Sequence, residues 1–247
     1  MLLRLLKTGL LAGFLTAIVY TAVQSVTVTP LILEAETYEN ATPGHSHGTA
    51  VRPAAGDAVL ILAHGHAEPA ATSDHGDHGG GWAPADGAER LFFTFLANLV
   101  ASVGFALLLA AGMALRGKPV DARLGLLWGL AGFAACSLAP ALGLPPEVPG
   151  AAAADLTARQ TWWLATAAAT AGGIALIAFA TRWPLRALGA VALLAPHLVG
   201  APHAPAGAQG AVPPELASHF VVWSLATAAL FWALLGTTCG ALYRRFS

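Results

Sequence analysis

Residues 91–115 read LFFTFLANLVASVGFALLLAAGMAL, an apolar run of 25 residues without one Asp, Glu, Lys or Arg. An α-helix rises about 1.5 Å per residue, and the hydrocarbon core of a bilayer is about 30 Å thick, so about 20 residues cross it. The run is long enough to do so. It predicts a transmembrane helix, and the rest of the chain repeats the pattern.

Further apolar segments occur on both sides of this run, at residues 5–33, 124–144, 160–181, 184–201 and 216–243, the fourth of them short for a span. Apolar residues make up 56% of the chain and charged residues only 10%, whereas soluble domains carry roughly 25% charged residues. The predicted fold class is therefore all-α, an integral membrane bundle of about six transmembrane helices.

The basic residues predict the orientation, because cytoplasmic loops retain Lys and Arg. With the N-terminus inside, nine of the twelve basic residues face the cytoplasm, among them Arg4, Arg116 and Arg244. Both termini are predicted to be cytoplasmic, in a multi-pass protein of the inner (plasma) membrane. The first apolar segment is expected to remain as a span, because it is too long for a signal peptide and lacks a clear cleavage site.

The histidines and carboxylates are distributed in the opposite way. In the orientation chosen from Lys and Arg alone, all nine histidines and twelve of the thirteen carboxylates fall on the outer side, Asp121 being the exception. We divide the chain into a first helix with an outer carboxylate cluster (1–39), a His-rich extracytoplasmic loop (40–87) and a five-helix membrane domain (88–247). The loop is rich in Gly, Ala, Pro, His and Asp, a composition expected to be disordered.

The loop has six histidines within residues 45–78. Neutral imidazole binds borderline divalent metals, and closely spaced pairs let a flexible chain wrap an ion, with an affinity that rises with pH as protons leave the rings. The alternative is a solvated tether without a ligand. The candidate metal-binding residues here are His45, His47, His64, His66, His75 and His78.

A second set lies at the outer membrane boundary. Charges there are costly unless they face a wet interior, and the i, i+4 spacing of Glu215 and His219 places them on one helix face. Taken singly, each has an ordinary alternative, such as Glu215 at a helix N-terminus. Taken together they predict a cation-binding mouth, for which the candidate ligands are Glu34, Glu36, Glu39, His197, His203, Glu215 and His219.

Few polar groups lie within the predicted spans, and they are expected to hydrogen-bond one helix to another rather than to bind substrate. The main ones are Gln24, Thr94, Asn98 and Ser102. Glycines four residues apart predict close helix contacts at Gly9/Gly13, Gly125/Gly129 and Gly236/Gly240. The chain lacks the GxxxxGK[ST], HExxH, GxSxG and CxxCH motifs, and no basic block suggests nucleic acid. We predict no catalytic residue and no permanently bound cofactor.

Several stretches in this order and spacing resemble the predicted cobalt transporter subunit family CbtA over essentially the whole chain. They are TPLILEAETYE (29–39), the His-rich loop, WAPADGAERLFFTFLANLVASVGFALLLA (82–110), GLLWGLAGFAACSLAPALGLPPEVPG (125–150), ADLTARQTWW (154–163), APHLVGAPH (195–203) and PPELASHFVVWSLATAALFWALLG (213–236). The resemblance implies a membrane protein of cobalt uptake and cobalamin synthesis, with a small single-span, His-bearing companion, the CbtB-type subunit.

Three functions compete. The favoured one is a membrane subunit that imports Co²⁺, although His clusters bind Ni²⁺, Cu²⁺ and Zn²⁺ at least as well, so cobalt is implied by the resemblance alone. The alternative is a membrane-anchored metal sensor or scaffold that binds the ion without translocating it, which the uncharged helix interiors favour. The third, a membrane enzyme with metal at the outer mouth, lacks a nucleophile or a recognisable base.

Overall fold

The computed structural model describes residues 1–41, 84–208 and 210–246, and within these ranges all regular secondary structure is helical. The six loop histidines fall outside the described residues. In order, the elements are α1 (Leu2–Ala41), α3 (Ala88–Arg116), α4 (Ala122–Phe133), the π-helix η2 (Ala134–Leu138), α5 (Ala139–Ala141), α6 (Leu156–Phe179), α7 (Trp183–Val199) and α8 (Pro214–Arg245).

The described helices have the lengths that the predicted membrane bundle requires. Five are long and apolar enough to cross a bilayer when α4, η2 and α5 are taken as one run, and α7 is a shorter apolar helix. The all-α fold class is confirmed. The short apolar segment at 184–201 corresponds to α7, which has 17 residues.

The first helix extends beyond its predicted end. Hydropathy places the end near Leu33, but α1 continues to Ala41 and carries Glu34 and Glu39 on additional turns. A helix satisfies its own backbone hydrogen bonds, so it continues where the side chains become polar. Thr37 supports this segment by donating its hydroxyl hydrogen bond to the carbonyl of Glu34. The carboxylates thus lie on a helix rather than in a loop.

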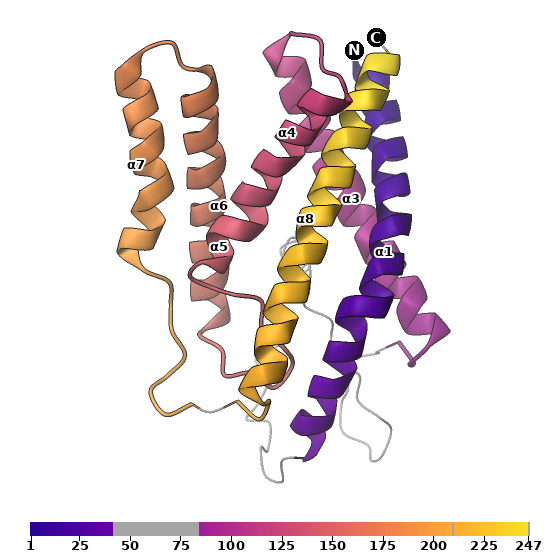
Figure 1. Cartoon of the computed structure of the whole chain (residues 1–247), viewed down its shortest axis with the longest axis vertical. Helices are drawn as coiled ribbons and strands as arrows, with labels where there is room; N and C mark the ends of the chain where they lie inside the picture. Colours follow the sequence, from indigo (N-terminus) through magenta and orange to yellow (C-terminus); the bar gives the residue numbers. More distant parts are fainter. Residues whose placement is uncertain (42–83, 209, 247) are drawn as a thin grey trace.

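The two chain ends meet at one end of the bundle (Figure 1). Arg4 donates hydrogen bonds from Nε and Nη2 to the carbonyl of Tyr243, at 3.0 and 2.7 Å. Its guanidinium also lies 3.6 Å from the centre of the Tyr243 ring. We call the opposite end, where α1 ends and α3 and α8 begin, the distal end. The two termini lie at the same end, as expected for the even number of membrane crossings that the sequence predicts.

Glycines set the closest helix contacts, and the predicted pairs are confirmed. A Cβ added at Gly236 of α8 would lie 2.6 Å from the Cα of Gly129 in α4. A Cβ at Gly13 of α1 would lie 2.6 Å from the Cα of Val103 in α3. Small residues let helix backbones approach closely in lipid, where there is no hydrophobic driving force between helices. The glycines therefore allow α4 to pack closely against α8, and α1 against α3.

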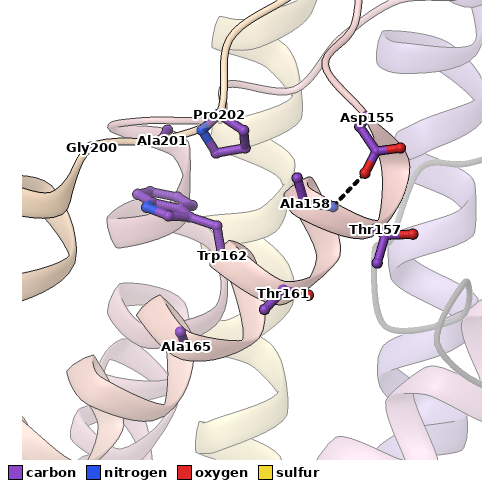
Figure 2. Close-up of a pocket in the computed structure, with 9 residues that line it drawn as sticks. All are labelled: Asp155, Thr157, Ala158, Thr161, Trp162, Ala165, Gly200, Ala201 and Pro202. Atoms are coloured by element: carbon purple, nitrogen blue, oxygen red, sulfur yellow. Dashed lines mark hydrogen bonds between the residues drawn. The ribbon is translucent and has the colours of Figure 1, made fainter.

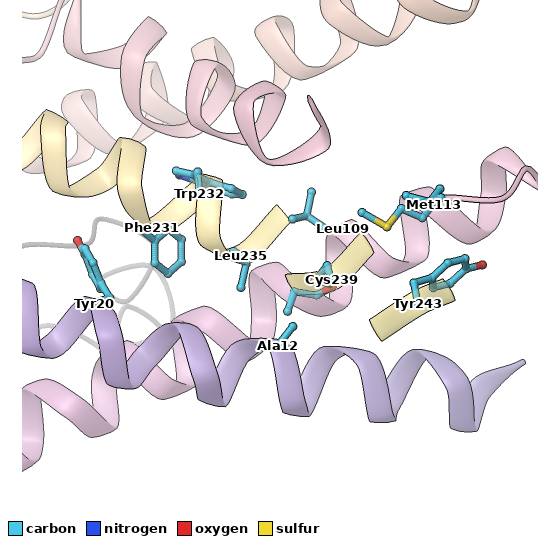
Figure 3. Close-up of a cluster of buried hydrophobic side chains, with 11 residues drawn as sticks. Ala12, Tyr20, Leu109, Met113, Phe231, Trp232, Leu235, Cys239 and Tyr243 are labelled. Carbon is cyan, nitrogen blue, oxygen red and sulfur yellow. Dashed lines mark hydrogen bonds between the residues drawn. The ribbon is translucent and has the colours of Figure 1, made fainter. Parts of the chain in front are cut away.

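An apolar core fills the space between α1, α3 and α8 (Figure 3). The rings of Tyr20 and Phe231 lie 5.0 Å apart, and the rings of Phe231 and Trp232 are perpendicular neighbours. Cys239 is fully buried there, with its sulfur 3.7 Å from the carbonyl oxygen of Ala106. It acts as a small packing residue.

The third span, predicted over 124–144, is confirmed as one helical run from Ala122 to Ala141, but it contains an irregular turn. Residues Ala134–Leu138 form a π-helix, and α5 ends at Ala141. Pro140 is buried and has no N–H to donate to the preceding turn, which disfavours a regular helix here. Trp232 Nε1 donates a hydrogen bond to Ser137 Oγ at 3.3 Å and joins the irregular segment to α8.

The remaining two helices form a hairpin at the edge of the bundle (Figure 1). Gly173 of α6 faces Gly189 of α7, and a Cβ on either would lie 2.7 Å from the carbonyl oxygen of the other. α7 packs mainly against α6, while α6 also contacts η2 and α5. The hairpin is therefore joined to the other helices chiefly through contacts of α6 with η2 and α5 of the third span.

Candidate functional site

An ion pair at the distal end joins α1 to α3. The Arg90 guanidinium donates to both carboxylate oxygens of Glu36, with Nη2 at 3.3 Å from Oε1 and 3.4 Å from Oε2. Arg90 Nε lies 3.1 Å from Asp86 Oδ1, in the turn before α3. The Arg90 side chain is only 7% exposed and that of Glu36 is 21% exposed. A predicted metal ligand is thus bound to a cation of the protein itself.

The other two carboxylates of the α1 end lie apart from this pair. Glu34 and Glu39 are both exposed. The Glu39 side chain lies against Gly150 of the loop that follows α5, where a Cβ on the glycine would be 3.3 Å from the Glu39 Cβ. Glu36 and Glu39 therefore reach different neighbours, although they are only three positions apart.

The predicted imidazole ligands are on different elements. His197 lies in the last turn of α7, where its ring centre is 6.2 Å from that of Trp162 in α6. His203 is exposed in the segment between α7 and α8. Glu215 and His219 are both exposed in the first turns of α8, on one face as their spacing predicts.

These residues do not converge in this conformation. Within residues 1–41, 84–208 and 210–246, no group of three or more His, Cys, Asp or Glu side chains is arranged to hold a metal ion. His197 belongs to the hairpin of α6 and α7, whereas the glutamates belong to α1. The combined mouth of carboxylates and imidazoles stays a prediction.

A second ion pair, which the sequence analysis did not single out, lies in the loop between α5 and α6. Arg159 Nη2 is 2.7 Å from Glu147 Oε2. Burial raises the pKa of the Glu147 carboxyl, and the nearby Arg159 charge lowers it part of the way back. Both side chains are about three-quarters buried, so the pair ties the loop to α6. Their spacing of twelve residues gives no local signal that would have identified the pair.

A shallow, largely open cavity of about 700 Å³ lies on the surface beside the start of α6 and the segment after α7 (Figure 2). Trp162 and Pro202 border it on one side, and Asp155, Thr157 and Thr161 supply its polar atoms. Asp155 Oδ1 also accepts a hydrogen bond from the Ala158 backbone N–H at 2.9 Å, which begins the helix. The cavity therefore has one acidic side in an otherwise largely apolar wall.

Sequence patterns point to single residues of this cavity, but not to the fact that they lie together. An Asp before an apolar helix is a recognisable N-cap, and Trp162 was identifiable only as a residue near the membrane boundary. The hairpin of α6 and α7 brings the segment after α7 next to Asp155 and Trp162. No local sequence pattern encodes that approach.

Comparisons with known proteins give one informative result. No curated protein matches the chain, and no solved structure matches it. A sequence model of one family matches residues 2–244 of the 247 residues. The protein therefore belongs to the family described as probable cobalt transporter subunit, CbtA, as its sequence resemblance predicted.

Proposed function

We propose that the protein is the membrane subunit through which Co²⁺ is imported for cobalamin synthesis. The observation that carries this proposal is the family match over residues 2–244, in a chain whose described helices have the length and apolarity of membrane spans. We further propose that the protein is not an enzyme, that it lies in the plasma membrane with its distal end outside, and that its partner is a small single-span CbtB-type subunit.

Capture of the ion is assigned to the distal end. A dehydrated divalent ion cannot enter hydrocarbon, so protein ligands must replace its water at the entrance. The loop gathers the ion, and the helix ends receive it. The proposed ligands are His45, His47, His64, His66, His75, His78, Glu34, Glu36, Glu39, His197, His203, Glu215 and His219.

The contact between Glu36 and Arg90 imposes a condition on this scheme. A carboxylate that accepts two guanidinium N–H groups has its charge neutralised. Co²⁺ therefore binds Glu36 only when Arg90 moves away or when the ion displaces it. In the contacts described above, Glu34 and Glu39 at the same helix end form no ion pair with an arginine, so an ion could reach them without displacing one.

A second function is favoured by one observation. No described group of three ligating side chains is present between the distal end and the termini, and the apolar core is close-packed there (Figure 3). A protein that only binds metal at its outer face, as a sensor or scaffold, needs no pathway through that core. The two functions differ in whether metal reaches the cytoplasm.

Cobalt accumulation separates them. Cells that lack their other metal importers would be compared with and without the chain for uptake of Co²⁺, Ni²⁺, Zn²⁺ and Cu²⁺. Import predicts intracellular cobalt that rises with expression. Metal bound to the membrane without intracellular accumulation would favour the scaffold. Deletion of residues 45–78 in the same assay shows whether the histidines accelerate capture or are required for it.

A further inference from the structure

Buried polar side chains are concentrated at the contact of α1, α3 and α8. Eight of the ten buried polar residues in the described part of the chain belong to these three helices, including Arg90 of α3 at the distal end, and the other two are threonines of α6. Those of the three-helix contact are Thr8, Thr16, Thr21, Gln24, Ser102, Ser224 and Thr227. In a protein whose outer surface faces lipid, such groups are usually few and face the interior.

The centre of this set is a hydrogen-bonded group of Thr21, Gln24 and Asn98. Together with Ser224 of α8, these residues are called the Asn98 cluster. Asn98 Nδ2 of α3 donates to Gln24 Oε1 at 2.7 Å and to Thr21 Oγ1 at 2.9 Å, both on α1. Two oxygens of one helix thus converge on a single nitrogen of another.

Ser224 of α8 adds a third helix. The rings of Tyr20 and Phe231 lie 5.0 Å apart, and Val28 and Phe220 share one apolar cluster. Between these two contacts of the antiparallel helices, Ser224 lies at about the level of Gln24. Ser224 is 1% exposed, and its hydroxyl has no hydrogen-bond partner among the described residues. An unpaired buried hydroxyl is unfavourable because it has lost its hydrogen bonds to water, and a bound ligand would offset that loss.

The chemistry of the cluster suits a cation in passage. The nitrogen of Asn98 occupies the point on which the Thr21 and Gln24 oxygens converge, and rotation of its amide would bring Oδ1 there instead. The cluster would then offer amide and hydroxyl oxygens without a fixed negative charge. Conduction requires a site that binds an ion strongly enough to admit it and weakly enough to release it, and neutral oxygens meet that requirement better than carboxylates.

We infer that the Asn98 cluster is a transit site for a partly hydrated divalent cation within the membrane. The inference rests on the proposed import function and names the route, the contact of α1, α3 and α8. Further buried hydroxyls without a described partner continue the route towards the termini at Thr16 and Ser102, about 12 Å along α1 from Gln24 in the case of Thr16.

Apolar side chains close the route on both sides in this conformation. Val28 and Phe220 pack together between the cluster and the distal end. Ala12, Leu235 and Cys239 fill the contact towards the termini (Figure 3). Passage therefore requires α8 to separate from α1 at these two levels in turn.

Asn98→Asp tests the site directly. Introduced into the chromosomal copy, so that every partner subunit is present, it adds a charge where the ion would rest. We expect the KM for Co²⁺ uptake to fall about tenfold and the maximal rate to fall as well, because the ion is held more tightly. Thr170→Asp is the matched control, since Thr170 is 3% exposed on α6, with a hydroxyl that also lacks a described partner.

Ser224→Ala is the milder variant, for the case in which the added charge prevents folding. We expect uptake to slow severalfold at low Co²⁺, while Thr170→Ala leaves it unchanged. In a background with Cys136→Ala and Cys239→Ala, the thiol of a Ser224→Cys variant should react with a cationic thiol reagent during uptake, and Co²⁺ should slow that reaction.

The outcomes are separable. If the unaltered chain accumulates no cobalt, the import function fails. If it accumulates cobalt, but Asn98→Asp and Ser224→Ala match the Thr170 controls in KM and Co²⁺ gives no protection of Ser224→Cys, the cluster only joins helices and the inference is overturned. A thiol that stays unreactive during active uptake also counts against it.

Discussion

The carboxylate of Glu36 in α1 and the guanidinium of Arg90 in α3 lie 3.3 Å apart, although 54 positions separate them in the chain. The contact joins α1 to α3 at the distal end, while the bonds of Arg4 to Tyr243 join α1 to α8 at the other end. The first helix is therefore held by charged or hydrogen-bonded contacts at both of its ends.

Loss of this contact should destabilise the protein measurably. Arg90→Met leaves the Glu36 carboxylate mostly buried without its partner, and we expect a loss of about 2 kcal/mol in the free energy of unfolding. Thermal unfolding in detergent measures it. Arg159→Met is the control, because the Arg159 side chain is 28% exposed against 7% for Arg90, and its effect should be smaller. Equal effects would contradict this account.

The glycine contact between α4 and α8 should tolerate no methyl group. Gly236→Ala places a Cβ 2.6 Å from the Gly129 Cα and close to the carbonyl oxygen of Gly125. Backbone atoms cannot rotate away, so we expect a loss of about 1–3 kcal/mol, seen as a lower unfolding temperature. Gly172→Ala in α6 meets nothing within 4 Å and should be neutral. A stable Gly236→Ala variant would show that these helices separate easily.

The ion pair of the loop after α5 gives a pH dependence of known sign. Burial raises the pKa of Glu147, so the folded protein takes up this proton at a higher pH than the unfolded chain. Between the usual glutamate pKa, about 4.3, and the raised value, the contribution of Glu147 to stability falls as pH rises.

Glu147→Gln removes that titration. The difference in free energy of unfolding between the wild type and Glu147→Gln should therefore shift against the wild type as the pH is raised through this window. Unfolding measured at several pH values checks this. A difference that stays constant with pH would show that the Glu147 carboxyl titrates alike in both states.

The proposed orientation of the protein in the membrane can be tested by thiol labelling. In a background with Cys136→Ala and Cys239→Ala, a His203→Cys thiol should react with a membrane-impermeant reagent in intact cells. A Lys118→Cys thiol should react only after permeabilisation. Both native side chains are exposed, so access to solvent is matched and only the side of the membrane differs. The reverse result would place the proposed ion entrance in the cytoplasm.

The helices and their close contacts were largely predictable from the sequence. Span length and glycine spacing are local properties, so the residues 91–115 and the pair Gly236/Gly240 could be recognised without a structure. The irregular turn at Ala134–Leu138 could not, because a π-helix differs from an α-helix by a single shifted register of hydrogen bonds.

The site was predictable only in part. The position of Glu36 after an apolar run predicts a ligand, but nothing local indicates that Arg90, 54 positions away, is its partner. Asn98 and Gln24 were expected to bond between helices, which Asn98 and Gln24 do. That Ser224 lies at the same level follows from the pairing of α8 with α1, which no local pattern encodes.

The position of α8 has a consequence for biogenesis. It leaves the ribosome after α1, α3 and α4, yet it packs against α4 and α1 and also contacts α3. Until it arrives, the glycine groove of α4 and the hydroxyls of α1 face lipid without their partner. A chain that stops before α8 therefore leaves these polar and close-packing surfaces exposed within the bilayer.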